Sequence, residues 1–163
     1  MRAYLFSAIT AIAFAAFSSI AQALLITGGV GPVGGQIVQG IGNQCLEIPG
    51  AASTAPIAAV QGFNCWGGLN QVWIITNGQI QQINNGSYTC MEVANSSTSP
   101  GALVQLNNCS GAANQLWEIN KHGEIVNLGS ALCLDWGNAY TTNGVQLTVE
   151  TCTAGSHQEF WLK

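Results

Sequence analysis

The tetrapeptide NQLW at residues 114–117 has a near copy, NQVW, at residues 70–73 and a more divergent copy, HQEF, at residues 157–160. The three copies lie about 44 residues apart. A fixed internal period of this length is typical of a repeated structural unit. We therefore expect the fold to consist of three similar units.

The segments upstream of each tetrapeptide also recur. Strand starts led by glycine stand at residues 35–37, 78–80 and 123–125. The segments CLEI, CMEV and CLDW begin at Cys45, Cys90 and Cys133, and the segments VQGFNC, VQLNNC and TVETC end at Cys65, Cys109 and Cys152. The predicted units are about 35–77, 78–122 and 123–163.

Six cysteines allow 15 pairings, and the repeat selects one of them. If the three units are equivalent, the disulfides are 45–65, 90–109 and 133–152. Each would close a loop of about 20 residues, which corresponds to roughly 3 kcal/mol in the chain-entropy model. A zinc site is disfavoured because the sequence has no C-x2-C pair.

Short segments of alternating apolar and polar residues, such as QVWIIT at 71–76 and ALVQLNN at 102–108, predict strands. Units of about 43 residues cannot each bury an apolar face alone. The sequence thus predicts an all-β fold of three four-stranded repeats closed into a pseudo-threefold barrel. Within Q-x-W the Gln and the aromatic residue share a face, so Trp73, Trp117 and Phe160 are expected to be equivalent core wedges. Each neighbouring Gln is expected to bind loop backbone groups.

The first 23 residues predict a secretory signal peptide. They contain Arg2, an apolar run and a small-x-small ending at residues 21–23. An uncleaved membrane anchor is the alternative, because the apolar run is nearly long enough to span a bilayer. Residues 24–34 are expected to be a flexible linker, followed by one domain at 35–163. The protein is predicted to be secreted and extracellular, without membrane insertion.

The chain carries 3 Lys and Arg against 7 Asp and Glu, a formal net charge of −4. Nucleic acids and anionic membrane surfaces are bound by clustered basic residues. The composition therefore argues against both as partners.

With these motifs the chain resembles the ricin B-chain-type lectins, the carbohydrate-binding β-trefoils. The resemblance covers residues 35–163 and rests on the three C-[LM]-[DE]-hydrophobic segments, the three cysteine pairs and the three Q-x-[WF] motifs. It implies a β-trefoil with one shallow sugar pocket per unit, usually for galactose. Glycans or glycoproteins are then the expected partners, and no cofactor is implied.

The resemblance also implies a role for each pocket residue. An Asp two positions after the first cysteine accepts hydrogen bonds from two sugar hydroxyls, and an aromatic residue two before the second cysteine stacks on the sugar. A Gln two positions earlier and the Asn-Gln of the tetrapeptide complete the pocket. These positions are Glu47, Gln61, Phe63, Asn70 and Gln71 in the first unit; Glu92, Gln105, Asn107, Asn114 and Gln115 in the second; and Asp135, Thr148, Glu150, His157 and Gln158 in the third.

The first unit keeps the family pattern best, with Glu in place of Asp. Glu is longer by one methylene, which moves its oxygens. Glu47 and Glu92 could instead be exposed carboxylates at strand ends. Phe63 and Trp66 could stack on a sugar or shield the disulfide, and the sugar role is favoured for Phe63.

In the third unit Trp136 is expected to be buried. Tyr140 is the candidate to replace the missing ring of that unit's pocket.

The chain is not expected to be an enzyme. Its few acids sit at symmetry-related positions that are far apart, and no nucleophile accompanies either histidine. The alternative to a lectin is a trefoil that has lost sugar binding and contacts a separate protein, as inhibitor-like trefoils do. Glycosylation sequons stand at Asn85, Asn95 and Asn108.

Overall fold

The computed structural model describes residues 33–50, 58–84, 87–139 and 141–163. The predicted signal peptide and most of the predicted linker lie outside this part. The first strand begins at Val33, two residues before the predicted start of the domain, because residues 33–35 pair with the strand that contains Trp73. In the described part, no helix is both long enough and apolar enough to cross a membrane.

The described chain consists of short strands and single-turn 3-10 helices. The strands are β1 (Val33–Gly35), β2 (Ile37–Gln39), β3 (Gln44–Glu47), β4 (Ala58–Ala59), β5 (Gln61–Asn64), β6 (Trp73–Thr76), β7 (Gln79–Asn84), β8 (Ser87–Val93), β9 (Ala102–Asn108), β10 (Trp117–Ile119), β11 (Ile125–Asn127), β12 (Cys133–Asp135), β13 (Val145–Gln146), β14 (Thr148–Glu150) and β15 (Phe160–Leu162). The 3-10 helices are η1 (Leu69–Gln71), η2 (Ala94–Ser96), η3 (Ala113–Gln115), η4 (Gly137–Ala139) and η5 (Ser156–Gln158).

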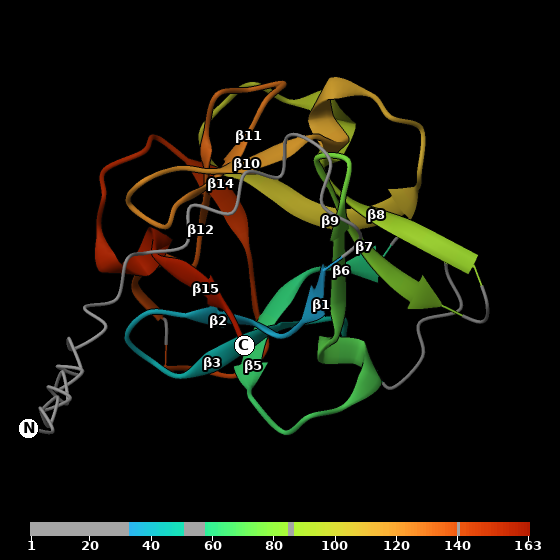
Figure 1. Ribbon diagram of the computed structural model, residues 1–163. Helices are drawn as coiled ribbons and strands as arrows, with labels where there is room; N and C mark the ends of the chain where they lie inside the picture. Colours follow the sequence, from blue (N-terminus) through green and yellow to red (C-terminus); the bar gives the residue numbers. More distant parts are fainter. Residues whose placement is uncertain (1–32, 51–57, 85–86, 140) are drawn as a thin grey trace, which may run out of the picture.

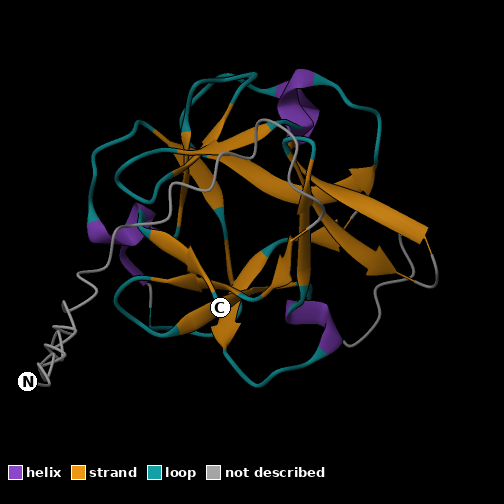
Figure 2. Cartoon of the chain, in the orientation of Figure 1, coloured by secondary structure: helices purple, strands orange, loops and turns teal. Residues whose placement is uncertain are grey.

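The strands form three similar lobes around a common axis (Figures 1 and 2). The last strand of each unit pairs with the first strand of the next, as in β6–β7 and β10–β11. The pair β15–β2 closes the ring between the two ends of the chain. This is the predicted β-trefoil.

The third strand of each unit passes through the centre, and the three are joined by a cyclic set of backbone hydrogen bonds. The amide of Val60 donates to Val104 O at 3.1 Å, that of Val104 to Leu147 O at 2.9 Å, and that of Leu147 to Val60 O at 2.9 Å. All three side chains are fully buried. Each unit thus supplies one donor and one acceptor to a closed ring, which satisfies buried backbone groups that would otherwise be unpaired.

The aromatic wedges are buried as predicted. Trp73 and Trp117 are fully buried, and their indole N–H groups donate to the equivalent carbonyls of Leu46 at 3.0 Å and Met91 at 2.9 Å. Phe160, also buried, is the third wedge.

The glycines that lead the first strands lie against these wedges. The amide of Trp117 donates to Gly78 O at 2.7 Å, and the amide of Phe160 donates to Gly123 O at 3.0 Å. Both glycines have φ near +77°, a conformation that favours glycine. The recurrent glycine therefore belongs to a turn, and its carbonyl binds the backbone amide of the aromatic core residue in the same unit.

The third unit fills its part of the core differently. Trp136 stands where the other units carry Ile48 and Val93, and its ring centroid is 6.3 Å from that of Phe160. Trp136 is buried as predicted, and its ring occupies the space where a side chain on Gly62 would lie. A glycine of the first unit thus makes room for a tryptophan of the third.

The three disulfides join Cys45 to Cys65, Cys90 to Cys109 and Cys133 to Cys152, which confirms the predicted pairing. Each links the second strand of a unit to the end of its third strand or to the residues directly after it. The disulfides therefore hold the two strands that carry the candidate pocket residues.

Candidate functional site

The strand register brings the predicted pocket residues of each unit together. In each unit the acid on the second strand pairs with the residue that precedes the expected aromatic position by two on the third strand. The pairs are Glu47 with Gln61, Glu92 with Gln105, and Asp135 with Thr148. The expected ring position lies opposite the first cysteine: Phe63 opposite Cys45, Asn107 opposite Cys90, and Glu150 opposite Cys133. The three candidate pockets are thus equivalent in backbone terms.

In the first unit, the Glu47 carboxylate accepts three side-chain hydrogen bonds. Gln61 Nε2 donates to Oε1 at 3.0 Å, while Gln71 Nε2 and Trp66 Nε1 both donate to Oε2 at 2.9 Å. Glu47 is only 4% exposed. A buried carboxylate needs such donors to offset the loss of its hydration.

Gln71 ties the loop after the second cysteine to this carboxylate. Its Oε1 accepts the amide of Trp66 at 3.0 Å and that of Gly67 at 3.3 Å, while its Nε2 donates to Asn64 O at 2.8 Å. Gln115 binds Ser110 N and Asn108 O in the same way, and Gln158 binds Thr153 N and Thr151 O. The predicted backbone role of the motif Gln is confirmed in all three units.

Asn70, also assigned to the first pocket, is turned toward the protein. Its Nδ2 donates to Ile48 O at 3.0 Å, and its buried Oδ1 has no hydrogen-bond partner in the described residues. Phe63 is half-buried on β5, and Trp66 is 58% exposed. The first pocket therefore combines a carboxylate, an unpaired amide oxygen and two aromatic rings.

In the second unit, four side-chain amides surround the Glu92 carboxylate. Oε1 accepts Gln105 Nε2 at 2.8 Å and Asn107 Nδ2 at 2.9 Å, and Oε2 accepts Gln115 Nε2 at 2.9 Å and Asn114 Nδ2 at 3.3 Å. All five residues assigned to this pocket thus form one hydrogen-bonded cluster.

The cluster lowers the pKa of Glu92. Burial of the carboxyl group by itself raises the pKa, while the hydrogen bonds from Gln105, Gln115, Asn107 and Asn114 lower it. Together the four bonds outweigh burial, so the pKa lies below its usual value of 4.5. Glu92 is therefore held in its charged form by the donors around it.

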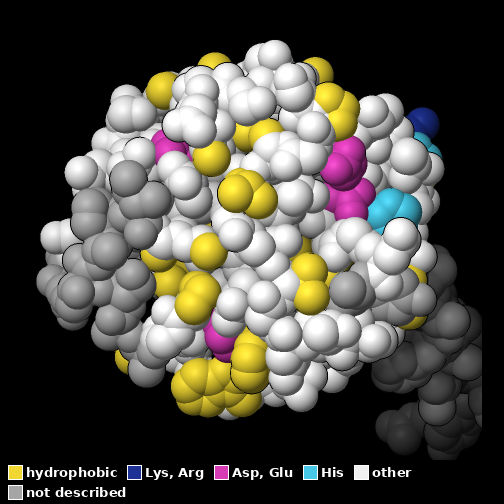
Figure 3. All heavy atoms as spheres, turned by 180° about the vertical axis from the view of Figure 1, so that it is seen from behind, with side chains coloured by type: hydrophobic (Ala, Val, Ile, Leu, Met, Phe, Trp, Pro, Cys, Tyr) yellow, Lys and Arg dark blue, Asp and Glu magenta, His cyan; other side chains and the backbone are white. Residues whose placement is uncertain are grey.

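The third unit holds its shorter acid differently. Gln158 Nε2 donates to Asp135 Oδ2 at 2.7 Å, and His157 Nε2 lies 3.4 Å from the same oxygen. Oδ1 accepts the backbone amide of Gly137. Neither Thr148 nor Glu150, both within the described chain, hydrogen-bonds to the carboxylate, so its third-strand side carries no side-chain donor. Figure 3 shows acidic side chains at separate places on one face, with a histidine beside one of them.

The structure corrects one expectation and adds one contact that the sequence did not predict. Glu47 and Glu92 are not exposed strand-end carboxylates: both are about 5% exposed or less, because amide side chains enclose them. The Trp66 hydrogen bond to Glu47 was not anticipated from the sequence, and the single signal available for it was an aromatic residue directly after Cys65.

Other candidate positions lie at the surface or outside the described residues. Tyr140 and the sequon residue Asn85 lie outside them. The other sequon residues, Asn95 and Asn108, are exposed.

A family model described as the ricin-type β-trefoil lectin domain matches residues 33–161. No curated protein matches the sequence of the chain. Among solved structures, the designed threefold-symmetric protein ThreeFoil has a TM-score of 0.70 and 29% identity, covering 79% of this chain and 96% of that chain.

Two natural proteins share the fold at lower identity. The agglutinin from Abrus precatorius has a TM-score of 0.69 and 22% identity, covering 83% of this chain and 50% of its own. This chain thus spans half the length of that agglutinin chain. The C-half of the earthworm R-type lectin, solved in complex with GalNAc, has a TM-score of 0.65 and 16% identity, covering 80% of this chain and 97% of its own. Because the family model matches nearly the whole described chain, the protein belongs to the family of ricin-type β-trefoil lectin domains.

Proposed function

We propose that this protein is a secreted lectin that binds galactose-type or related glycans, with the first unit as its principal site. Family membership supports a binding role rather than a catalytic one. The GalNAc complex of the earthworm lectin, which shares the fold, supports the sugar class. Secretion would follow from the predicted signal peptide at residues 1–23.

The observation that carries the assignment is the presence of one aromatic ring, Phe63, near a buried carboxylate, Glu47, in the first unit. Phe63 is half-buried on the strand opposite Cys45, and Trp66 hydrogen-bonds to Glu47. A sugar presents hydroxyl donors, which suit a carboxylate, and an apolar face, which suits a ring. The equivalents of Phe63 are Asn107 and Glu150, and those of Trp66 are Ser110 and Thr153.

The other two units are proposed as weaker sites. In the second unit, Glu92 already accepts four amide hydrogen bonds, so a sugar hydroxyl would compete with internal donors. In the third unit, Asp135 has the shorter side chain typical of the family, and a second carboxylate, Glu150, stands at the ring position. Weak sites on one body can still add avidity on a multivalent glycan surface.

The experiment is a broad glycan array with residues 24–163, followed by calorimetric titration of each hit. Phe63→Ala and Asn107→Ala are a matched pair, because the two residues occupy equivalent positions in different units. We expect Phe63→Ala to weaken binding about five- to thirtyfold, as loss of a stacking ring worth about 1–2 kcal/mol implies. Asn107→Ala should change it less than threefold.

Equal losses in the two variants would contradict the assignment to the first unit. A response confined to sugars other than galactose and GalNAc would support the lectin proposal but contradict the proposed sugar class. An array without any response, from a protein that unfolds cooperatively, would argue against a lectin.

A second candidate function, contact with a protein, is favoured by one feature of the second unit. Ile83 and Tyr88 are paired across β7 and β8, and each is 54% exposed. Exposed apolar pairs of this kind occur at protein contacts. If the array is silent, Tyr88→Ser should weaken binding to a secreted protein partner, whereas Phe63→Ala should not.

A further inference from the structure

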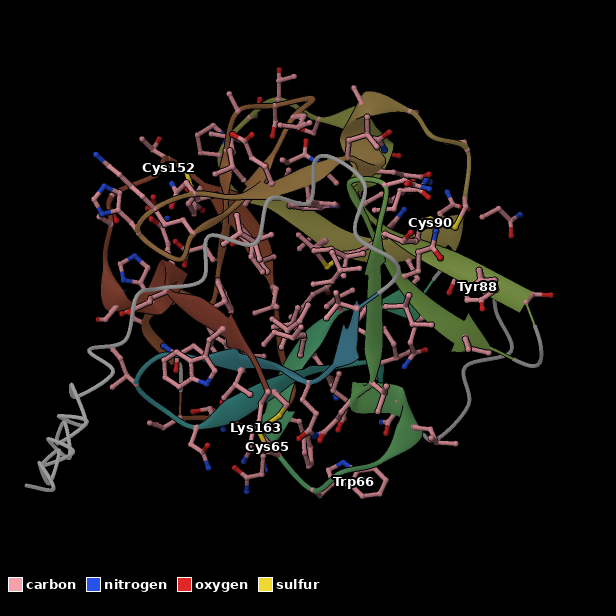
Figure 4. All side chains as sticks on the ribbon, viewed as in Figure 1. Cys65, Trp66, Tyr88, Cys90, Cys152 and Lys163 are labelled. Atoms are coloured by element: carbon pink, nitrogen blue, oxygen red, sulfur yellow. A yellow bond between two sulfur atoms is a disulfide. The ribbon has the colours of Figure 1, made fainter. Side chains whose placement is uncertain are left out.

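The Trp66 indole contacts the carboxylate assigned to the candidate pocket of the first unit and lies over Gly68. It stands on the loop between β5 and η1, at the outer edge of the molecule (Figure 4). Its Nε1 donates to Glu47 Oε2 at 2.9 Å. It therefore takes one of the acceptor sites that a sugar hydroxyl would use in the function proposed above.

The backbone and the side chain of Trp66 are held by different contacts. The amide of Trp66 donates to Gln71 Oε1 at 3.0 Å, which anchors the loop. In the described structure, the one hydrogen bond of the ring itself is the bond to Glu47, and the side chain is 58% exposed. The indole can therefore leave by rotating about its side-chain bonds without any change in the loop, a motion that exposed side chains make rapidly.

The closed ring covers a second acceptor. Gly68 lies directly beneath it, since a side chain on Gly68 would collide with the benzo edge of Trp66 and approach Asn70 Oδ1. This Asn70 oxygen is buried and has no partner in the described chain. Buried polar atoms without partners are uncommon, and each calls for an explanation.

The cover is confined to the first unit. At the equivalent positions, Ser110 Oγ donates to Gln115 Oε1 at 3.1 Å and Thr153 Oγ1 donates to Gln158 Oε1 at 2.9 Å. Both side chains are too small to reach across a pocket. In the second unit the corresponding acceptor, Glu92 Oε2, is taken by two amides.

We infer that Trp66 is a hinged cover of the first-unit pocket, and that a neutral sugar binds by displacing it. This inference rests on the lectin function proposed above. When the indole swings out, one sugar hydroxyl takes its place on Glu47 Oε2 and a second donates to Asn70 Oδ1. The site then selects ligands with two neighbouring hydroxyl donors. An anionic sugar is disfavoured because both oxygens are acceptors and one is charged.

The cover predicts that its removal strengthens binding. If the closed state is held nine-tenths of the time, the apparent affinity is reduced about tenfold, and this factor is regained when the ring is removed. Trp66→Ser restores the residue of the second unit at this position. Trp161→Ser is the matched control, because Trp161 is also an exposed tryptophan but lies on β15 and makes no side-chain hydrogen bond with the pocket residues.

The test applies wild type, Trp66→Ser and Trp161→Ser to the same glycan array, with titration of methyl galactoside and GalNAc. The expected result is binding several-fold to tenfold tighter for Trp66→Ser and unchanged for Trp161→Ser. Sugar should also shift the tryptophan emission of wild type and of Trp161→Ser, because the indole moves into water, but not that of Trp66→Ser.

The outcomes separate the two proposals. If wild type binds sugar and Trp66→Ser binds equally or more weakly, Trp66 is a sugar contact or a bystander; the cover is refuted and the lectin stands. If neither wild type nor Trp66→Ser binds any glycan while both remain folded, the cover proposal and the lectin proposal are both refuted. Binding seen with Trp66→Ser alone would support the cover, and it would restore the lectin proposal after a silent wild-type array, because wild type would then be mostly closed.

Discussion

The first and second units have a glutamate at the same position, but different side chains donate hydrogen bonds to its carboxylate. Glu47 accepts two amides and one exposed indole, whereas Glu92 accepts four amides from side chains around it. The motif glutamine is common to both and binds the loop behind the second cysteine. What differs is the pair of positions flanking that cysteine, Phe63 and Trp66 against Asn107 and Ser110. The carboxylate and its glutamine donors are thus common to the two units. Under the proposed function, the two differing positions would determine whether a ligand can enter.

The largest expected effect tests the part that the two units share. Trp73→Ala and Trp117→Ala should each lower the free energy of unfolding by about 3–5 kcal/mol, because each removes a fully buried ring and leaves a cavity. Each change also leaves an equivalent carbonyl, that of Leu46 or Met91, without its indole donor. Urea unfolding of both variants measures the effect. A difference above about 2 kcal/mol between them would break the equivalence of the units.

The next effect tests the amide cluster of the second unit. Glu92→Gln keeps the shape of the side chain but turns one acceptor oxygen into a donor that faces two of the four amide donors. At neutral pH we expect a loss of about 1–3 kcal/mol, the cost of leaving buried donors unpaired. Glu118→Gln, on the exposed side of β10, is the control and should stay within about 0.5 kcal/mol of wild type. Equal stability of wild type and Glu92→Gln would mean that the cluster is neutral for folding.

The acid dependence of stability sharpens the same point. The pKa of Glu92 is lowered in the folded protein, so its charged form is favoured by folding. Its contribution is present above the usual value of 4.5 and is lost as the pH falls through the lower folded pKa. Urea unfolding between neutral pH and pH 3 should therefore show a smaller acid-induced loss for Glu92→Gln than for wild type. A parallel fall in the two proteins would contradict the pKa assignment.

The smallest effect concerns one donor of the four. Asn107→Ala removes the bond to Glu92 Oε1 and leaves Gln105 on that oxygen. We expect a loss of about 0.5–1.5 kcal/mol in unfolding free energy and a slightly higher pKa for Glu92, which carboxyl NMR titration can follow. Unchanged titration would show that Asn107 does not contribute to the cluster.

The fold could be predicted because its signals repeat. The cysteine spacing, the leading glycine and the Q-x-[WF] motif each occur three times, so an assignment made in one unit can be compared with the same position in the other two. The tryptophan and phenylalanine wedges follow from their place in strands, and the glutamine contacts follow from the need to pair loop backbone groups.

The site could be predicted only in outline. The assigned positions do meet, but their hydrogen bonds depend on side-chain length and rotamers, which do not repeat. All three acids are buried, whether Glu or Asp, but Glu47 and Glu92 each accept a bond from a third-strand glutamine, whereas Thr148 stands at that position opposite Asp135. The bond from Trp66 depends on Gly68, whose lack of a side chain leaves space for the ring. No periodic pattern encodes that combination.

The contact between Gly62 and Trp136 limits how the units could be exchanged. The first unit supplies the only small residue at its position, where the others carry Leu106 and Val149, and the third unit supplies the only large one at its own. A chain rebuilt from three copies of the third unit would drive each tryptophan into a valine. One rebuilt from three copies of the second unit would meet no such collision. The third unit therefore cannot be copied into the other two positions unless this contact is redesigned.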